Sequence, residues 1–175
     1  MQSTNSPDRI ATEILNLGSR LVAIDGAHGS GKSTLARALA NRLTAKLVEV
    51  DKFLVPNQGH YILSLDLKEI TASIDSENIC ILEGICMQKV VELTGLTPDF
   101  NVYVKRMAKW GWADEDDLVF DVPIENHLQR LKQQAAPFFE HSQYPQLGLW
   151  EEIIRYHAEF RPQDICNITF QRSDA

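Results

Sequence analysis

The sequence is poor in several features that mark specialised classes of protein. It has only three cysteines in 175 residues, and no two of them form a Cys-x-x-Cys pair, so we expect free thiols rather than a metal site or disulfides. No apolar run approaches the roughly 20 residues that span a membrane. Residues 1–7 are polar and lack the apolar core of a signal peptide. We therefore expect a cytoplasmic protein with no membrane partner.

Positive charge is also scarce. Lysine and arginine together number 17 against 24 acidic residues, the net charge is −7, and no basic run occurs. A general surface for nucleic acid is therefore not expected. An acidic protein that binds a nucleotide must instead build its own local positive site.

One stretch provides such a site. Residues 26–33 read Gly-Ala-His-Gly-Ser-Gly-Lys-Ser, which fits the phosphate-binding loop G-x-x-x-x-G-K-[ST]. An apolar run at 21–24 precedes it, and residues 34–43 carry leucines four apart, as in a strand followed by a helix. Backbone N–H groups of such a loop point at an anion, and the helix N-terminus adds positive charge. The predicted nucleotide-binding residues are Gly26, Ala27, His28, Gly29, Ser30, Gly31, Lys32, Ser33 and Thr34.

Two of these residues have predicted chemical roles of their own. Lys32 should reach the β- and γ-phosphates, and the Ser33 hydroxyl should bind Mg²⁺. A GTPase switch would also need Asp-x-x-Gly after a strand and an Asn-Lys-x-Asp guanine motif, and neither string occurs in the chain.

Strand-like and helix-like segments alternate along the rest of the chain. Further strands are predicted at residues 46–51, 78–84, 101–105 and 165–170, and further helices at 7–17, 66–74, 86–94, 123–135 and 149–160. This alternation favours a parallel sheet with helices on both faces and a ligand site at the carboxyl ends of the strands. We predict a single α/β domain over residues 1–175.

Two acids lie at the ends of predicted strands at this edge. Asp51 could accept a proton from a substrate hydroxyl or hold Mg²⁺ through water; the alternative is a turn cap. Glu83 lies at the end of a strand that is apolar on both faces, in the position that holds Mg²⁺ beside a phosphate loop. The alternative for Glu83 is an acid at an exposed strand end.

A cation follows the fourth of the five strands. Arg106 could neutralise charge that moves between phosphoryl donor and acceptor, or it could be a solvated arginine. Residues 107–122 have no clear period and form a candidate lid that would exclude water; the alternative for 114–117 is an acidic surface loop. His157, on a partly apolar helix, is predicted to be a packed core histidine.

The order of these motifs resembles the uridine kinase-like P-loop kinases. The resemblance covers most of residues 20–170 and lies in the sequence around the phosphate loop (22–36), Val-Asp-Lys-Phe (50–53), Ile-Leu-Glu-Gly-Ile (81–85) and Tyr-Val-Lys-Arg (103–106). It implies a three-layer P-loop fold with a five-stranded parallel sheet, and ATP with Mg²⁺.

The resemblance also implies roles for particular residues. It maps the catalytic base onto Asp51, the acid of the Glu-Gly motif onto Glu83, and basic lid residues onto Arg106 and Lys109. We further expect the acceptor to contact Asp51, Phe53 and Tyr61.

The resulting hypothesis is an ATP-dependent kinase that phosphorylates a hydroxyl of a small metabolite, with nucleosides among the candidates. One alternative is a nucleotide-binding regulatory module with little transferase activity. Another is a P-loop phosphotransferase that acts on an antibiotic or a sugar nucleotide.

Overall fold

The computed structural model describes residues 2–56, 60–75, 77–138 and 148–173. Within these ranges one sheet has seven strands, ordered β1-β7-β5-β2-β4-β3, with β6 paired to β5. Every pair along this order is parallel, and only β5–β6 is antiparallel. The strands are β1 (Gln2–Thr4), β2 (Leu21–Asp25), β3 (Lys46–Glu49), β4 (Cys80–Glu83), β5 (Phe100–Ala108), β6 (Gly111–Trp112) and β7 (Ile168–Ser173).

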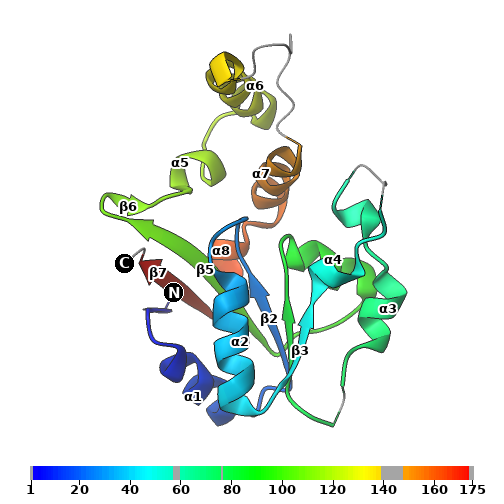
Figure 1. Ribbon diagram of the computed structural model, residues 1–175. Coiled ribbons are helices and arrows are strands. Elements are labelled where there is room, and N and C mark those ends of the chain that lie inside the picture. Colours follow the sequence, from blue (N-terminus) through cyan, green and yellow to red (C-terminus); the bar gives the residue numbers. More distant parts are fainter. Residues whose placement is uncertain (1, 57–59, 76, 139–147, 174–175) are drawn as a thin grey trace.

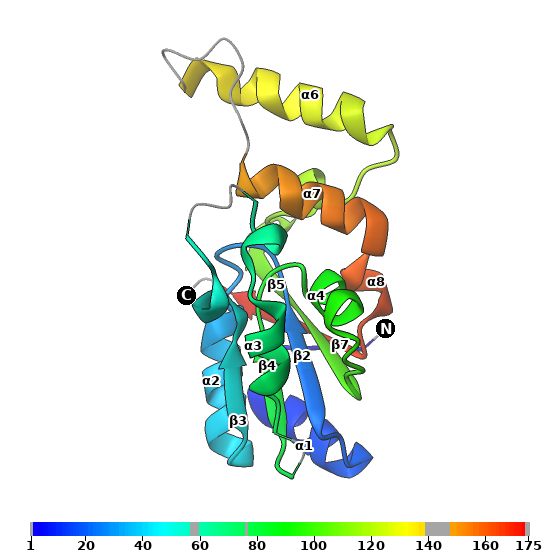
Figure 2. The ribbon, with the colours of Figure 1, turned by 90° about the vertical axis from the view of Figure 1, so that its right-hand side faces the viewer.

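Helices connect these strands and cover both faces of the sheet (Figures 1 and 2). They are α1 (Pro7–Leu17), α2 (Lys32–Leu43), α3 (Leu67–Ala72), α4 (Met87–Thr94), α5 (Glu115–Leu118), α6 (Ile124–Ala135), α7 (Leu149–Phe160) and α8 (Pro162–Ile165). Short 3-10 turns occur at η1 (Val50–Phe53), η2 (Ile62–Ser64) and η3 (Ala136–Phe138). The predicted α/β fold with a parallel sheet is confirmed. The sheet has six parallel strands rather than the predicted five, because β1 also pairs with β7. None of the described helices is long and apolar enough to cross a membrane.

The period-2 alternation of the strands divides the core into two layers. On one face, α1 and α2 pack on a cluster that includes Val22, Ile24, Ile81, Val102 and Val104. On the other face, α3, α4 and α7 pack on a cluster that includes Cys80, Leu82 and Tyr103. The sheet is thus buried on both sides, as expected for parallel strands.

Local signals explain most of the element boundaries. Ser6 caps α1 by accepting a hydrogen bond from the Arg9 backbone N–H, and Gly18 ends the helix with φ 62°. The predicted strand at 165–170 begins later, at Ile168, because Pro162 starts the short helix α8. Residues 52–63, between β3 and α3, include parts of η1 and η2, and residues 57–59 lie outside the described ranges.

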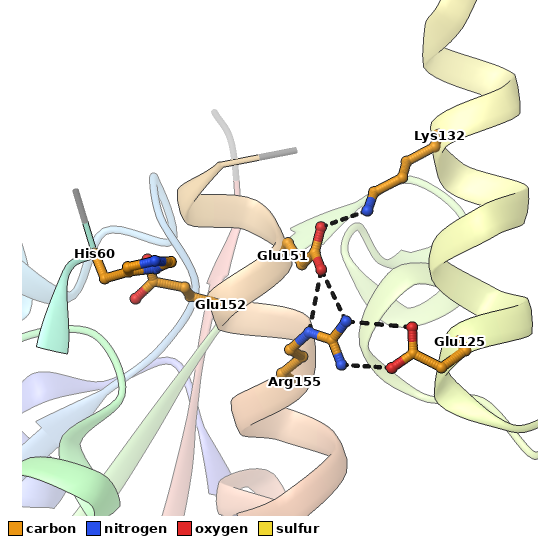
Figure 3. Close-up of polar contacts among 6 residues, drawn as sticks. All are labelled: His60, Glu125, Lys132, Glu151, Glu152 and Arg155. Atoms are coloured by element: carbon orange, nitrogen blue, oxygen red, sulfur yellow. Dashed lines mark hydrogen bonds and ion pairs between the residues drawn. The ribbon is translucent and has the colours of Figure 1, made fainter. Parts of the chain in front are cut away.

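Helix α6 lies at the far end of the molecule, beyond α7 (Figures 1 and 2). Charged side chains join the two helices: Arg155 of α7 pairs with Glu125 of α6 at 2.8 Å, and Glu151 of α7 pairs with Lys132 of α6 at 2.7 Å (Figure 3). Exposed pairs of this kind contribute about 0–1 kcal/mol each. The apolar side chains Leu128 and Leu131 of α6 are buried and belong to the core cluster.

The core histidine is confirmed. His157 is 2% exposed, and its Nδ1 lies 2.7 Å from the Ile153 carbonyl oxygen, which can only accept. Nε2 therefore accepts from the Tyr103 hydroxyl, at 2.7 Å. Burial lowers the pKa of His157 from 6.5 to about 4.

This burial predicts a pH-dependent stability. Between pH 6.5 and 4 the unfolded chain binds a proton that the folded His157 does not, so His157 makes the folded state less stable as the pH falls through this window. The free energy of unfolding of wild type, measured with urea, should therefore fall from pH 7 to pH 4 by about 3 kcal/mol more than that of His157→Gln.

Taking the difference cancels other groups that titrate in both proteins. A difference that stays constant over this pH range would contradict the buried, neutral state of His157.

Candidate active site

The loop at residues 26–33 connects β2 to α2, as predicted. The Gly26 N–H donates to Asp25 Oδ1 at 2.7 Å. A side chain at Gly26 would place its Cβ 2.8 Å from the Val104 carbonyl oxygen, so only glycine fits there. Lys32 is 6% exposed, and its Nζ lies 3.5 Å from the Ala27 carbonyl oxygen.

Two features of this loop fit an anionic ligand. Within the described residues no side chain caps the N-terminus of α2, and its first turn contains no acid, so its N–H groups and partial positive charge remain available. Ser30 is fully buried, and its Oγ has no hydrogen-bond partner among the described residues. A buried hydroxyl without a partner is costly, and a phosphate oxygen would supply one.

Glu83 lies beside the loop because β4 pairs with β2. Ile24 and Glu83 are register partners, and the Ser33 hydroxyl donates to Glu83 Oε1 at 2.9 Å. Glu83 is 4% exposed, and burial raises its pKa although Ser33 and Lys32 act in the opposite direction. A hydroxyl and a carboxylate are hard oxygen ligands that suit Mg²⁺.

The described residues include no group of three or more His, Cys, Asp or Glu side chains that could hold a metal. Mg²⁺ is usually held by one or two carboxylates together with water and substrate phosphates.

Asp51 and Tyr61 come together at the next strand end. Asp51 is exposed in η1, directly after β3. The Tyr61 hydroxyl donates to Asp51 Oδ1 at 2.5 Å, and burial together with Asp51 raises the pKa of Tyr61. Phe53, the third predicted acceptor contact, packs against the core cluster.

Arg106 has a partner that the sequence did not predict. Its Nη2 lies 2.7 Å from Oδ1 of Asp114, which is 5% exposed. Arg106 Nε and Asp114 Oδ2 are both buried without a hydrogen-bond partner among the described residues. Arg106 lies inside β5, which continues to Ala108, and not after a strand that ends at residue 105. The candidate lid follows it, where β5 turns into β6. Lys109, in the same turn, is exposed.

Three further residues contact the loop or its flank and were missed. Asp25 is 4% exposed, and burial raises its pKa from 3.8 to about 6. The Tyr156 hydroxyl of α7 donates to Asp25 Oδ2. Arg172 of β7 donates from Nη1 to the Gly29 carbonyl oxygen at 3.2 Å.

A sequence signal existed for only one of the three. Asp25 directly precedes the first glycine of the loop and could have been noticed. Tyr156 and Arg172 lie more than 120 positions further along the chain, and no motif connects them to the loop.

The fold and this arrangement define the chain as a P-loop kinase. The family model described as shikimate kinase matches residues 28–159. The chain therefore belongs to the shikimate kinase family, whose members are ATP-dependent small-molecule kinases that transfer phosphate to an alcohol.

Individual relatives are distant. A curated shikimate kinase from Sulfurihydrogenibium sp. (strain YO3AOP1) is 25% identical over 131 residues, which cover 62% of this chain and 76% of the relative. A solved structure described as a possible uridine kinase from Bacillus stearothermophilus is 18% identical, with a TM-score of 0.54 and coverage of 94% and 96% of the two chains. The shikimate kinase from Acinetobacter baumannii, solved with shikimate, is 15% identical, with a TM-score of 0.49 and coverage of 94% and 89%.

These comparisons confirm the predicted kinase class and change the family from uridine kinase-like kinases to shikimate kinases. The chain matches a shikimate kinase model, and its fold is shared with a structure described as a uridine kinase. The comparisons give no specific support to a nucleoside as the acceptor.

Proposed function

We propose that this chain transfers the γ-phosphoryl group of MgATP to a hydroxyl of a small metabolite, with Asp51 as the general base. One observation carries the proposal: an exposed carboxylate, held at one oxygen by Tyr61, follows the strand next to the one that ends in Glu83. Among the described residues no hydrogen bond engages Asp51 Oδ2. This oxygen is therefore the one available to an acceptor hydroxyl.

The residues divide the work by their chemistry. The backbone of residues 26–34 would bind the phosphates, and Lys32 would neutralise negative charge on the β- and γ-phosphates. Ser33 and Glu83 would hold Mg²⁺, and bound Mg²⁺ neutralises charge that develops between donor and acceptor. Asp51 Oδ2 would take the proton of the attacking hydroxyl. Arg106, oriented by Asp114, would add positive charge at the lid side.

The acceptor is proposed at the level of chemical class. The name of the curated relative refers to shikimate, a ring compound with hydroxyl groups and a carboxylate, and the family match makes such acids the first candidates. Nucleosides are the second group of candidates, through the motif resemblance to uridine kinase-like kinases, and antibiotics and sugar nucleotides are the third. The alternative is a regulatory module that binds the nucleotide but transfers no phosphate. The experiment must separate this alternative from catalysis.

The decisive experiment is a screen of ADP release with the purified protein and MgATP. The panel contains shikimate, other hydroxylated ring acids, nucleosides and sugars, and Lys32→Ala is the background for each compound. We expect at least one acceptor to stimulate ADP release by wild type alone. If no compound raises wild type above Lys32→Ala while both bind MgATP, a binding module is the better interpretation.

Asp51→Asn should leave MgATP affinity within a few-fold of wild type and slow phosphoryl transfer by roughly 10²-fold or more, because the variant keeps the shape and loses the base. Single-turnover transfer to the acceptor found in the screen checks this.

The control is Asp8→Asn, which removes an acid of α1 whose side chain is 76% exposed. Transfer by Asp51→Asn at the wild-type rate would reject Asp51 as the base.

Glu83→Gln should weaken the binding of Mg²⁺, because a carboxylate ligand is replaced by a neutral amide. The rate should then respond to Mg²⁺ only at higher concentrations than in wild type. Thermal stability should stay near wild type, since the exchange removes a buried charge without changing shape. A Mg²⁺ titration of the rate measures the effect.

Glu77→Gln is the matched control, because Glu77 is exposed and precedes the opposite end of the same strand. Identical Mg²⁺ titrations for Glu83→Gln and wild type would exclude the proposed metal role.

A further inference from the structure

Glu152 of α7 binds the segment that carries Tyr61. The Tyr61 backbone N–H donates to both Glu152 oxygens, at 3.1 and 3.0 Å. His60 Nδ1 lies 3.2 Å from Glu152 Oε1. Figure 3 shows Glu152 on the side of α7 that faces His60, whereas Glu151 and Arg155 face α6. One acid of α7 thus holds two consecutive residues that lie about 90 positions earlier in the chain.

Tyr61 is fixed at its other end as well. Its hydroxyl donates to Asp51 Oδ1, and the residue is only 9% exposed. A Cβ on Gly84 would lie 3.4 Å from the Tyr61 hydroxyl oxygen, an ordinary contact distance, and 2.9 Å from Val50 Cβ, so glycine at this position lets Val50 of η1 approach the end of β4. A tyrosine held by its backbone and enclosed around its ring can orient the carboxylate that its hydroxyl contacts.

The same helix contacts the phosphate loop one turn later. Tyr156, four residues after Glu152 and therefore on the same helix face, donates to Asp25 and accepts from the Gln88 backbone N–H at 3.1 Å. Asp25 in turn accepts from the Gly26 N–H. Glu152 and Tyr156 of α7 therefore contact two different segments, the one that carries Tyr61 and the start of the phosphate loop. Helix α7 in this way fixes the positions of the two segments relative to each other.

We propose that Glu152 is a positioning residue for phosphoryl transfer, acting through Tyr61 to orient Asp51 so that Oδ2 faces the acceptor hydroxyl. The proposal rests on the proposed role of Asp51 as the base. It assigns Tyr61 to the orientation of the base rather than to acceptor binding alone. The proposal also gives α7 a part in catalysis that needs no contact with substrate, because α7 fixes the position of the phosphate loop relative to that of Asp51.

A positioning role predicts an effect on kcat rather than on nucleotide binding. Misplacing a catalytic group by about 1 Å can cost up to 10²-fold, so Glu152→Ala and Tyr61→Phe should each lower kcat roughly tenfold, with the KM for MgATP within about twofold of wild type. Glu152→Gln retains an amide oxygen that can accept from the Tyr61 N–H, and it should recover part of the rate lost in Glu152→Ala.

Glu151→Ala is the matched control. Glu151 is the adjacent acid of α7 but contacts Lys132 and Arg155 instead of Tyr61, so its removal should leave kcat within about twofold. Equal losses in Glu151→Ala and Glu152→Ala would show a general effect of the helix and would overturn the proposal. A loss confined to the KM for MgATP would also overturn it.

A double-variant cycle tests whether Glu152 acts through Asp51. In the Asp51→Asn background, adding Glu152→Ala should cause no further loss, because the group that it positions is already gone. Multiplicative losses would overturn the proposal. If Asp51→Asn itself transfers at the wild-type rate, the proposed base is wrong. If Asp51→Asn is slow but Glu152→Ala and Tyr61→Phe match wild type, only the positioning role is wrong.

Discussion

The parallel register of β2, β4 and β3 is the constraint on which the site depends. Glu83 is paired with Ile24 on one side and with Glu49 on the other, so the three strands end together. The phosphate loop, Glu83 and Asp51 consequently emerge at one edge of the sheet. A shift of one residue in β4 would turn Glu83 to the opposite face and separate it from Ser33. The register of the strands therefore places both acids at the same edge of the sheet as the phosphate loop.

Helix α7 adds the second constraint, because it carries polar side chains into a buried layer. Tyr156 contacts Asp25, His157 contacts Tyr103, and Glu152 contacts the Tyr61 backbone. Buried polar groups are costly unless they are paired, so these contacts restrict where α7 can lie. The ion pairs between α7 and α6 are more exposed and contribute less to this restriction.

Much of the fold could be predicted, because its signals are local. Helix α7 was predicted with its observed bounds, and the Ser6 cap, Pro7 and Gly18 defined α1. The five main strands were found from apolar runs. Strands β1 and β6 have only three and two residues, too few for a period to be visible, and they form because longer strands offer an edge for pairing. The start of β7 was placed too early because a helix of four residues gives no recognisable pattern.

The sequence by itself determined the phosphate loop, the acids at the strand ends and the kinase class, because each depends on residue types at short, fixed spacings. Only the tertiary structure decided which side chains contact these residues. Tyr61 meets Asp51, Asp114 meets Arg106, Arg172 reaches the loop, and Tyr156 meets Asp25. Contacts between distant segments depend on how helices and strands pack together. Such packing is set by the whole core, and no local pattern records it.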